Sequence, residues 1–111
     1  MNIQEYRDWR PTYSSYNVVF PEDAPPVREV FHDEFRQFLA LSGLSCEASE
    51  AQAAMHKTFR KGIKPDYSKI KDELSDVWWY FNMCLDEFGW TLEELSQYNK
   101  EKLDERHGKT S

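Results

Sequence analysis

The sequence predicts an all-α protein, an antiparallel bundle of four to five helices, and three observations support this prediction. Apolar side chains recur at intervals of three and four residues along most of the chain, which is the period of an amphipathic helix. The four glycines fall where these periodic segments pause or end, as helix-terminating glycines do. No segment alternates apolar and polar side chains in the manner of a half-buried strand.

The first half of the chain predicts a short helix, a loop and a long helical region. A weakly helical segment over 3–10 is expected to end at a proline, and 11–26 contains four prolines, which favours a wrapping loop. The helical period then runs over 27–41 and again over 44–60. Gly43 lies between these two segments, which form either two helices or one continuous helix.

The second half predicts two further helices with clear boundaries. The first begins near Asp66 or Ser68 and ends before Gly89, which is expected to cap it. The last helix opens with a capping box, in which Thr91 is followed three residues later by a glutamate, and it ends near Arg106. The short connections make neighbouring helices antiparallel.

Length and charge narrow the class of protein. At 111 residues the chain, 1–111, is expected to be one domain, since this length supports a single modest core. The chain has no apolar run of membrane-spanning length and no signal-peptide layout at its start, so we expect a cytoplasmic protein without a membrane partner. A net charge of −6 disfavours nucleic acid as a partner. It is compatible with a nucleotide whose phosphates a metal ion bridges to carboxylates.

A short acidic pattern occurs twice, 26 residues apart, over 44–51 and 70–77. Both copies read apolar-x-x-Glu-apolar-Ser-acid-apolar, so each places two carboxylates three residues apart. Residues at i and i+3 share a face of a helix, and both acidic pairs fall on the border of an apolar stripe. The four acids are Glu47, Glu50, Glu73 and Asp76.

This doubled pattern predicts a metal site. When two such stripes pack antiparallel, the four carboxylates converge at the rim of the core and repel one another unless a cation lies between them. Acidic oxygen ligands suit a hard cation, so Mg²⁺ is expected, with Mn²⁺ as a substitute. The alternative is that these are ordinary solvated glutamates and aspartates, which are common on helix surfaces. The matching positions of the two pairs favour the metal site.

Three elements together resemble the MazG-like branch of the all-α nucleotide pyrophosphohydrolases. The first two are Glu-x-x-Glu and Glu-x-x-Asp, separated by 22 residues, and the third is Asn99-x-x-Lys102-Leu103-x-x-Arg106. They occur in the family's order, and the resemblance covers 43–107. It implies Mg²⁺-dependent hydrolysis of a nucleoside triphosphate, in particular a deoxynucleoside triphosphate, to the monophosphate and pyrophosphate.

The resemblance also implies roles for individual residues. The four acids would hold Mg²⁺, and Glu47 or Glu50 would act as general base toward the attacking water. Ser49 and Ser75 stand where relatives often carry glycine, which leaves the preferred base and sugar open. The residues expected to contact the substrate are Lys57, Tyr80, Asn99, Lys102 and Arg106.

Trp79 is expected to face away from both the apolar stripe and the acidic border of its helix. In a monomer a large aromatic side chain there lies in water, which favours a partner surface, with cover by the 11–26 loop as the alternative. The resemblance likewise implies a homodimer or a dimer of dimers. A different class of function stays open: a catalytically inactive helical interaction or regulatory module that retains the fold.

Overall fold

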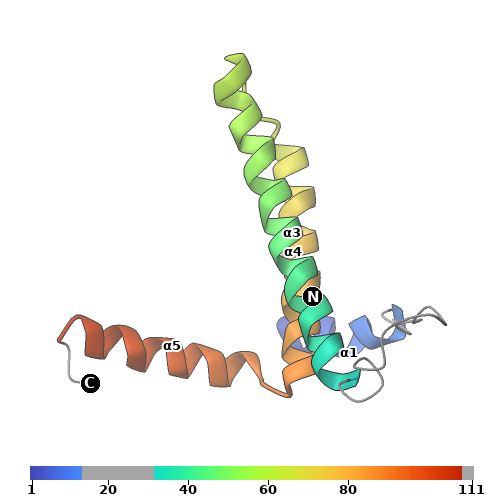
Figure 1. Cartoon of the computed structure of the whole chain (residues 1–111), viewed down its shortest axis with the longest axis vertical. Coiled ribbons are helices and arrows are strands. Elements are labelled where there is room, and N and C mark those ends of the chain that lie inside the picture. Colours follow the sequence, from blue (N-terminus) through green and yellow to red (C-terminus); the bar gives the residue numbers. More distant parts are fainter. Residues whose placement is uncertain (14–31, 109–111) are drawn as a thin grey trace.

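The computed structural model describes residues 1–13 and 32–108, and it confirms the all-α prediction for these residues (Figure 1). No strand occurs within the described ranges, and none of their helices is long and apolar enough to cross a membrane. The helices are α1 (Ile3–Tyr13), α3 (His32–Lys61), α4 (Tyr67–Phe88) and α5 (Leu92–Arg106).

Helices α3 and α4 pack side by side as a long antiparallel hairpin (Figure 1). The turn between them contains Gly62 at φ 64°, a left-handed conformation that glycine adopts without strain. Asp66 caps the start of α4, where its side chain accepts a hydrogen bond of 3.1 Å from the Lys69 backbone N–H. Gly89, at φ 73°, caps the end of α4 by donating its N–H to the Leu85 carbonyl. Both predicted boundaries of α4 are confirmed.

Hydrogen bonds join the two helices at the end of the hairpin away from the turn at Gly62. The Arg36 guanidinium on α3 donates to both carboxylate oxygens of Glu87 on α4, with an Nη2 to Oε1 distance of 2.8 Å. The Gln37 amide donates to the backbone carbonyl of Glu87 at 3.1 Å. These bonds lie beside the few fully buried apolar residues of the hairpin, which include Ala40 and Leu85.

Helix α1 packs against the C-terminal half of α4. Arg7 Nη1 donates to the side chain of Asn82 at 2.9 Å, and both Arg7 and Arg10 form ion pairs with Asp86. Arg10 is 1% exposed and its guanidinium lies 5.6 Å from the ring centroid of Trp79. Trp79 is partly exposed, and Arg10 of α1 covers part of its ring.

One expected boundary is wrong, and one choice that the sequence left open is resolved. Helix α1 continues through Pro11 to Tyr13, because the hydrogen bond that a proline removes lies close to the end of the helix. Its last residues therefore replace the first part of the expected 11–26 loop. Helix α3 runs without a break through Gly43, which resolves the choice between two helices and one. The rest of that loop and the expected helix start at 27 lie outside the described residues.

Helix α5 projects away from the hairpin and makes only marginal contact with the other described helices (Figure 1). Thr91 caps it as predicted, since its hydroxyl accepts a hydrogen bond of 3.1 Å from the Glu94 backbone N–H. The radius of gyration is 17.8 Å, whereas a compact domain of this length has about 13 Å. The single chain is therefore an extended arrangement around one hairpin.

Candidate metal centre

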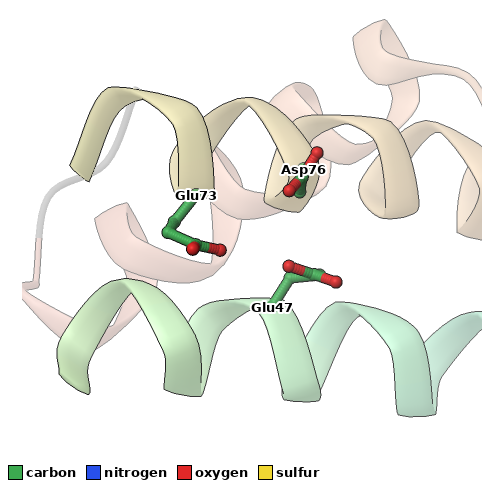
Figure 2. Close-up of side chains that lie close together, drawn as sticks. All are labelled: Glu47, Glu73 and Asp76. Atoms are coloured by element: carbon green, nitrogen blue, oxygen red, sulfur yellow. The ribbon is translucent and has the colours of Figure 1, made fainter. Parts of the chain in front are cut away.

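Three carboxylates from two helices meet on the α3–α4 hairpin (Figure 2). Glu47 on α3 points toward α4, where Glu73 and Asp76 lie one turn apart. Each of the three offers an oxygen that lies within 4.8 Å of the oxygens of the other two. The antiparallel packing of the two acidic borders, expected from the doubled pattern, therefore places these three side chains together.

Glu50, the fourth predicted ligand, lies at the edge of this cluster. It is exposed, and it is outside the group whose oxygens approach within 4.8 Å of one another. It lies one turn after Glu47 on α3, and its negative charge contributes to raising the pKa of Glu47. Its carboxylate also lies 4.0 Å from the Cys46 thiol on the preceding turn of α3. The structure thus brings three of the four predicted carboxylates together with the fourth beside them.

The cluster is electrostatically unbalanced at Glu47. Removal from water raises the pKa of this carboxyl, and repulsion from Glu50, Asp76 and Glu73 raises it further. Because the folded state raises the pKa of Glu47 above its ordinary value of 4.5, the stability of the fold falls as the pH rises from 4.5 through the raised pKa. A cation held between the carboxylates would offset this repulsion.

The donor set fits a hard divalent cation. Glu73 is buried at 7% exposure, and Glu47 Oε2 is buried without a hydrogen-bond donor among the described residues. A buried carboxylate oxygen without a partner is costly, and coordination to a metal is one way to satisfy it. All three donors are carboxylate oxygens, with no histidine or thiol in the group, and such ligands suit Mg²⁺ or Mn²⁺.

Lys69 is a residue of this site that the sequence analysis missed. Its ammonium Nζ lies 3.2 Å from Glu73 Oε1, one turn further along α4. The available signal was the four-residue spacing of a lysine and a glutamate on one helix. This spacing is frequent on helix surfaces, so by itself it does not single out a functional pair.

Tyr80 lies one turn after Asp76 on α4 and is partly buried. Its ring packs against the backbone of Gly43 on α3, where an added Cβ would lie 2.2 Å from Tyr80 Cε1. Gly43 is itself one turn before Glu47. The predicted substrate residue Tyr80 is thus next to the carboxylate cluster and helps to set the distance between the two helices.

The remaining predicted substrate residues are not near the cluster in the described part of the chain. Lys57 is exposed on α3, ten residues after Glu47 and therefore about 15 Å further along the helix. Asn99, Lys102 and Arg106 are exposed on α5, which points away from the hairpin (Figure 1). Within one chain, these four residues do not complete the site.

An open pocket lies where α4 ends and α5 begins. Its volume is about 470 Å³, and it is lined by Trp90, Glu94, Leu95 and Tyr98. Trp90 stacks on Phe88 with ring centroids 5.0 Å apart, yet it is half exposed, and Tyr98 is 69% exposed. This surface is apolar and incompletely covered by the described residues.

The cluster thus offers carboxylate oxygens from two helices, with an ammonium and a tyrosine at its sides. Comparison of the chain with protein-family models, with curated proteins and with solved structures found no match in any of the three. The function of the site is therefore inferred from its own residues and from the sequence pattern.

Proposed function

We propose that this protein hydrolyses a nucleoside triphosphate, in particular a deoxynucleoside triphosphate, to the monophosphate and pyrophosphate in a Mg²⁺-dependent reaction. The observation that carries the proposal is the convergence of Glu47, Glu73 and Asp76 from two helices, with a buried carboxylate oxygen that lacks a donor among the described residues. The MazG-like spacing of the acidic pairs supports a nucleotide as the substrate.

The residues divide into a metal group and a group that handles protons and phosphate. Glu47, Glu73 and Asp76 would hold Mg²⁺, with Glu50 beside them. When bound, Mg²⁺ supplies positive charge to the phosphate oxygens and acidifies water. Glu47 or Glu50 accepts the proton of the water that attacks the α-phosphorus, and Glu50 is exposed, which leaves room for that water. The bond from the α-phosphorus to the bridging oxygen breaks, and pyrophosphate leaves.

We further propose that the protein acts as a homodimer or a dimer of dimers. An isolated helix of the length of α5 is only marginally stable in water, and α5 makes only marginal contact with the other described helices. Packing α5 on a second copy would cover its apolar side chains. The same packing can bring the Lys102 and Arg106 cations of one copy to the carboxylates of another, which a single chain does not do.

Product analysis tests the proposed activity. The full chain is incubated with a panel of ribo- and deoxynucleoside triphosphates and Mg²⁺, and the products are separated by chromatography. We expect a monophosphate and pyrophosphate in equal amounts. Glu47→Gln should lower kcat/KM by at least about 100-fold because it removes a charged ligand and a candidate base. Glu34→Gln, the same change at an exposed position on α3, should leave the rate unchanged.

Two results would contradict this proposal. Release of single phosphate would show that the wrong bond had been assigned. Absence of turnover of every nucleotide with Mg²⁺ or Mn²⁺, in a chain whose circular dichroism is helical, would favour the inactive interaction module instead.

A further inference from the structure

The ion pair between Lys69 and Glu73 joins an exposed ammonium to a nearly buried carboxylate. The Nζ to Oε1 distance is 3.2 Å, and the side chains of Lys69 and Glu73 are 59% and 10% exposed. An ordinary lysine–glutamate pair at this spacing lies wholly in water and contributes little. Here the carboxylate is nearly buried beside two other carboxylates, whereas the ammonium reaches it from the solvent side.

The carboxylate that Lys69 pairs with belongs to a cluster formed by both helices of the hairpin. The ammonium Nζ contacts Oε1 of Glu73, a carboxylate that also lies within 4.8 Å of oxygens of Glu47 on α3 and Asp76 on α4. Because Glu47 belongs to α3, Lys69 is paired with a cluster to which both helices contribute. Among residues 1–13 and 32–108, no other cationic side chain forms an ion pair with a carboxylate of the cluster.

We infer that Lys69 is the resident counterion of the metal-free cluster and competes with the divalent cation for Glu73. The ammonium neutralises part of the repulsion between the carboxylates, which allows the hairpin to fold without metal. A divalent cation bound by the cluster would be repelled by this ammonium and would compete with it for the negative charge of Glu73. Lys69 therefore lowers the affinity of the cluster for a metal ion and raises the stability of the metal-free fold.

The inference rests on the proposed function only in its choice of a divalent cation as the competitor. Lys69 is a counterion of the site that the MazG-like spacing does not indicate. Lys69 is not assigned a contact with the reacting atoms.

A comparison of two lysine variants tests the inference on the full chain. Lys69→Gln removes the ammonium but retains the backbone N–H that bonds to Asp66. Lys71→Gln is the matched control, because Lys71 is exposed on the same turn of α4 and the net charge changes equally. Binding of Mn²⁺ is measured by the loss of the free-ion electron paramagnetic resonance signal at constant ionic strength.

We expect Lys69→Gln to bind Mn²⁺ at least about threefold more tightly than Lys71→Gln, since a cation close to the metal is removed. Without metal, Lys69→Gln should melt at a lower temperature than Lys71→Gln, and added Mn²⁺ should raise its melting temperature by more. Lys69→Arg, which retains the charge, should resemble the wild type in affinity.

Each contrary result has a distinct meaning. Equal Mn²⁺ affinity in Lys69→Gln and Lys71→Gln, with binding present, would overturn the counterion role and leave the proposed function standing. Weaker binding in Lys69→Gln would also overturn it, because Lys69 would then support the metal rather than compete with it. The expected difference in affinity without nucleotide hydrolysis would support the counterion role and contradict the proposed function. Absence of Mn²⁺ binding in every variant would overturn both.

Discussion

Gly43 and Tyr80 form a residue-scale contact that positions the two helices of the metal centre. The ring of Tyr80 fills the space that a side chain at position 43 would take. Glu47 follows Gly43 by one turn on α3, and Asp76 precedes Tyr80 by one turn on α4. The closeness of the helices beside the carboxylates therefore depends on the absence of a Cβ at one position.

The variant Gly43→Ala tests this contact. The added Cβ would lie 2.2 Å from Tyr80 Cε1 and 2.3 Å from Tyr80 Cδ1, so the ring or the helix must move. Overpacking costs about 1–3 kcal/mol, whereas alanine gains about 1 kcal/mol in helix propensity over glycine. We expect a net loss of stability of about 1 kcal/mol in urea unfolding, because the clash outweighs the propensity gain.

A double-mutant cycle controls for the propensity term. In a Tyr80→Ala background the clash is absent, so Gly43→Ala should instead stabilise the chain by about 1 kcal/mol. If Gly43→Ala stabilised both backgrounds equally, the close approach of Tyr80 to α3 would be wrong.

At the same scale, the sequence predicts the acids of the centre better than the other residues around it. Glu47, Glu73 and Asp76 could be grouped because helical periodicity places each on the border of an apolar stripe, and the stripes must face each other. The same reasoning placed Glu50 in the group, but its side chain is more exposed. Lys69 could not be singled out, since its importance depends on the burial of Glu73 against α3.

At the scale of the elements, boundaries set by local chemistry were predictable. Asp66 and Thr91 cap helices through bonds to residues only three positions away, and Gly89 ends α4 with a left-handed backbone. These interactions need no information from distant parts of the chain. The boundaries at both ends of α4 and at the start of α5 therefore match their sequence signals.

Elements whose placement depends on distant contacts were not predictable. The position of α1 is set by Arg7 and Arg10, which bond to Asn82 and Asp86 more than 70 residues away. Nothing in the local sequence indicates these partners. The contact between Arg10 and the ring of Trp79 follows from the same docking.

At the scale of the whole molecule, much apolar surface is left uncovered by the described residues. Trp90, Tyr98 and Leu103 near or on α5 are 51%, 69% and 39% exposed, and Phe59 at the far end of α3 is 75% exposed. Where such side chains lie together, as Trp90, Leu95 and Tyr98 do around the open pocket, they are typical of an interaction surface. The extended shape and the projecting α5 agree with the homo-oligomer that we propose.

Self-association is expected to depend on the apolar side of α5. Size-exclusion chromatography with light scattering should give a mass of two or four chains. Leu103→Lys should shift the protein toward the monomer, because burial of a lysine against a partner is unfavourable. Gln97→Lys adds the same charge at an exposed position about 120° around α5 from Leu103 and should leave the mass unchanged. A wild-type mass of one chain at micromolar concentration would contradict the proposed assembly.

The central claim is that carboxylates of α3 and α4 together hold a divalent cation, and anomalous diffraction from crystals grown with Mn²⁺ tests it most directly. We predict one strong anomalous peak bonded to carboxylate oxygens of Glu47 on α3 and of Glu73 and Asp76 on α4, with the Lys69 ammonium moved off Glu73. The contradicting result is a structure at saturating Mn²⁺ with no anomalous peak between the two helices and with Lys69 still paired to Glu73.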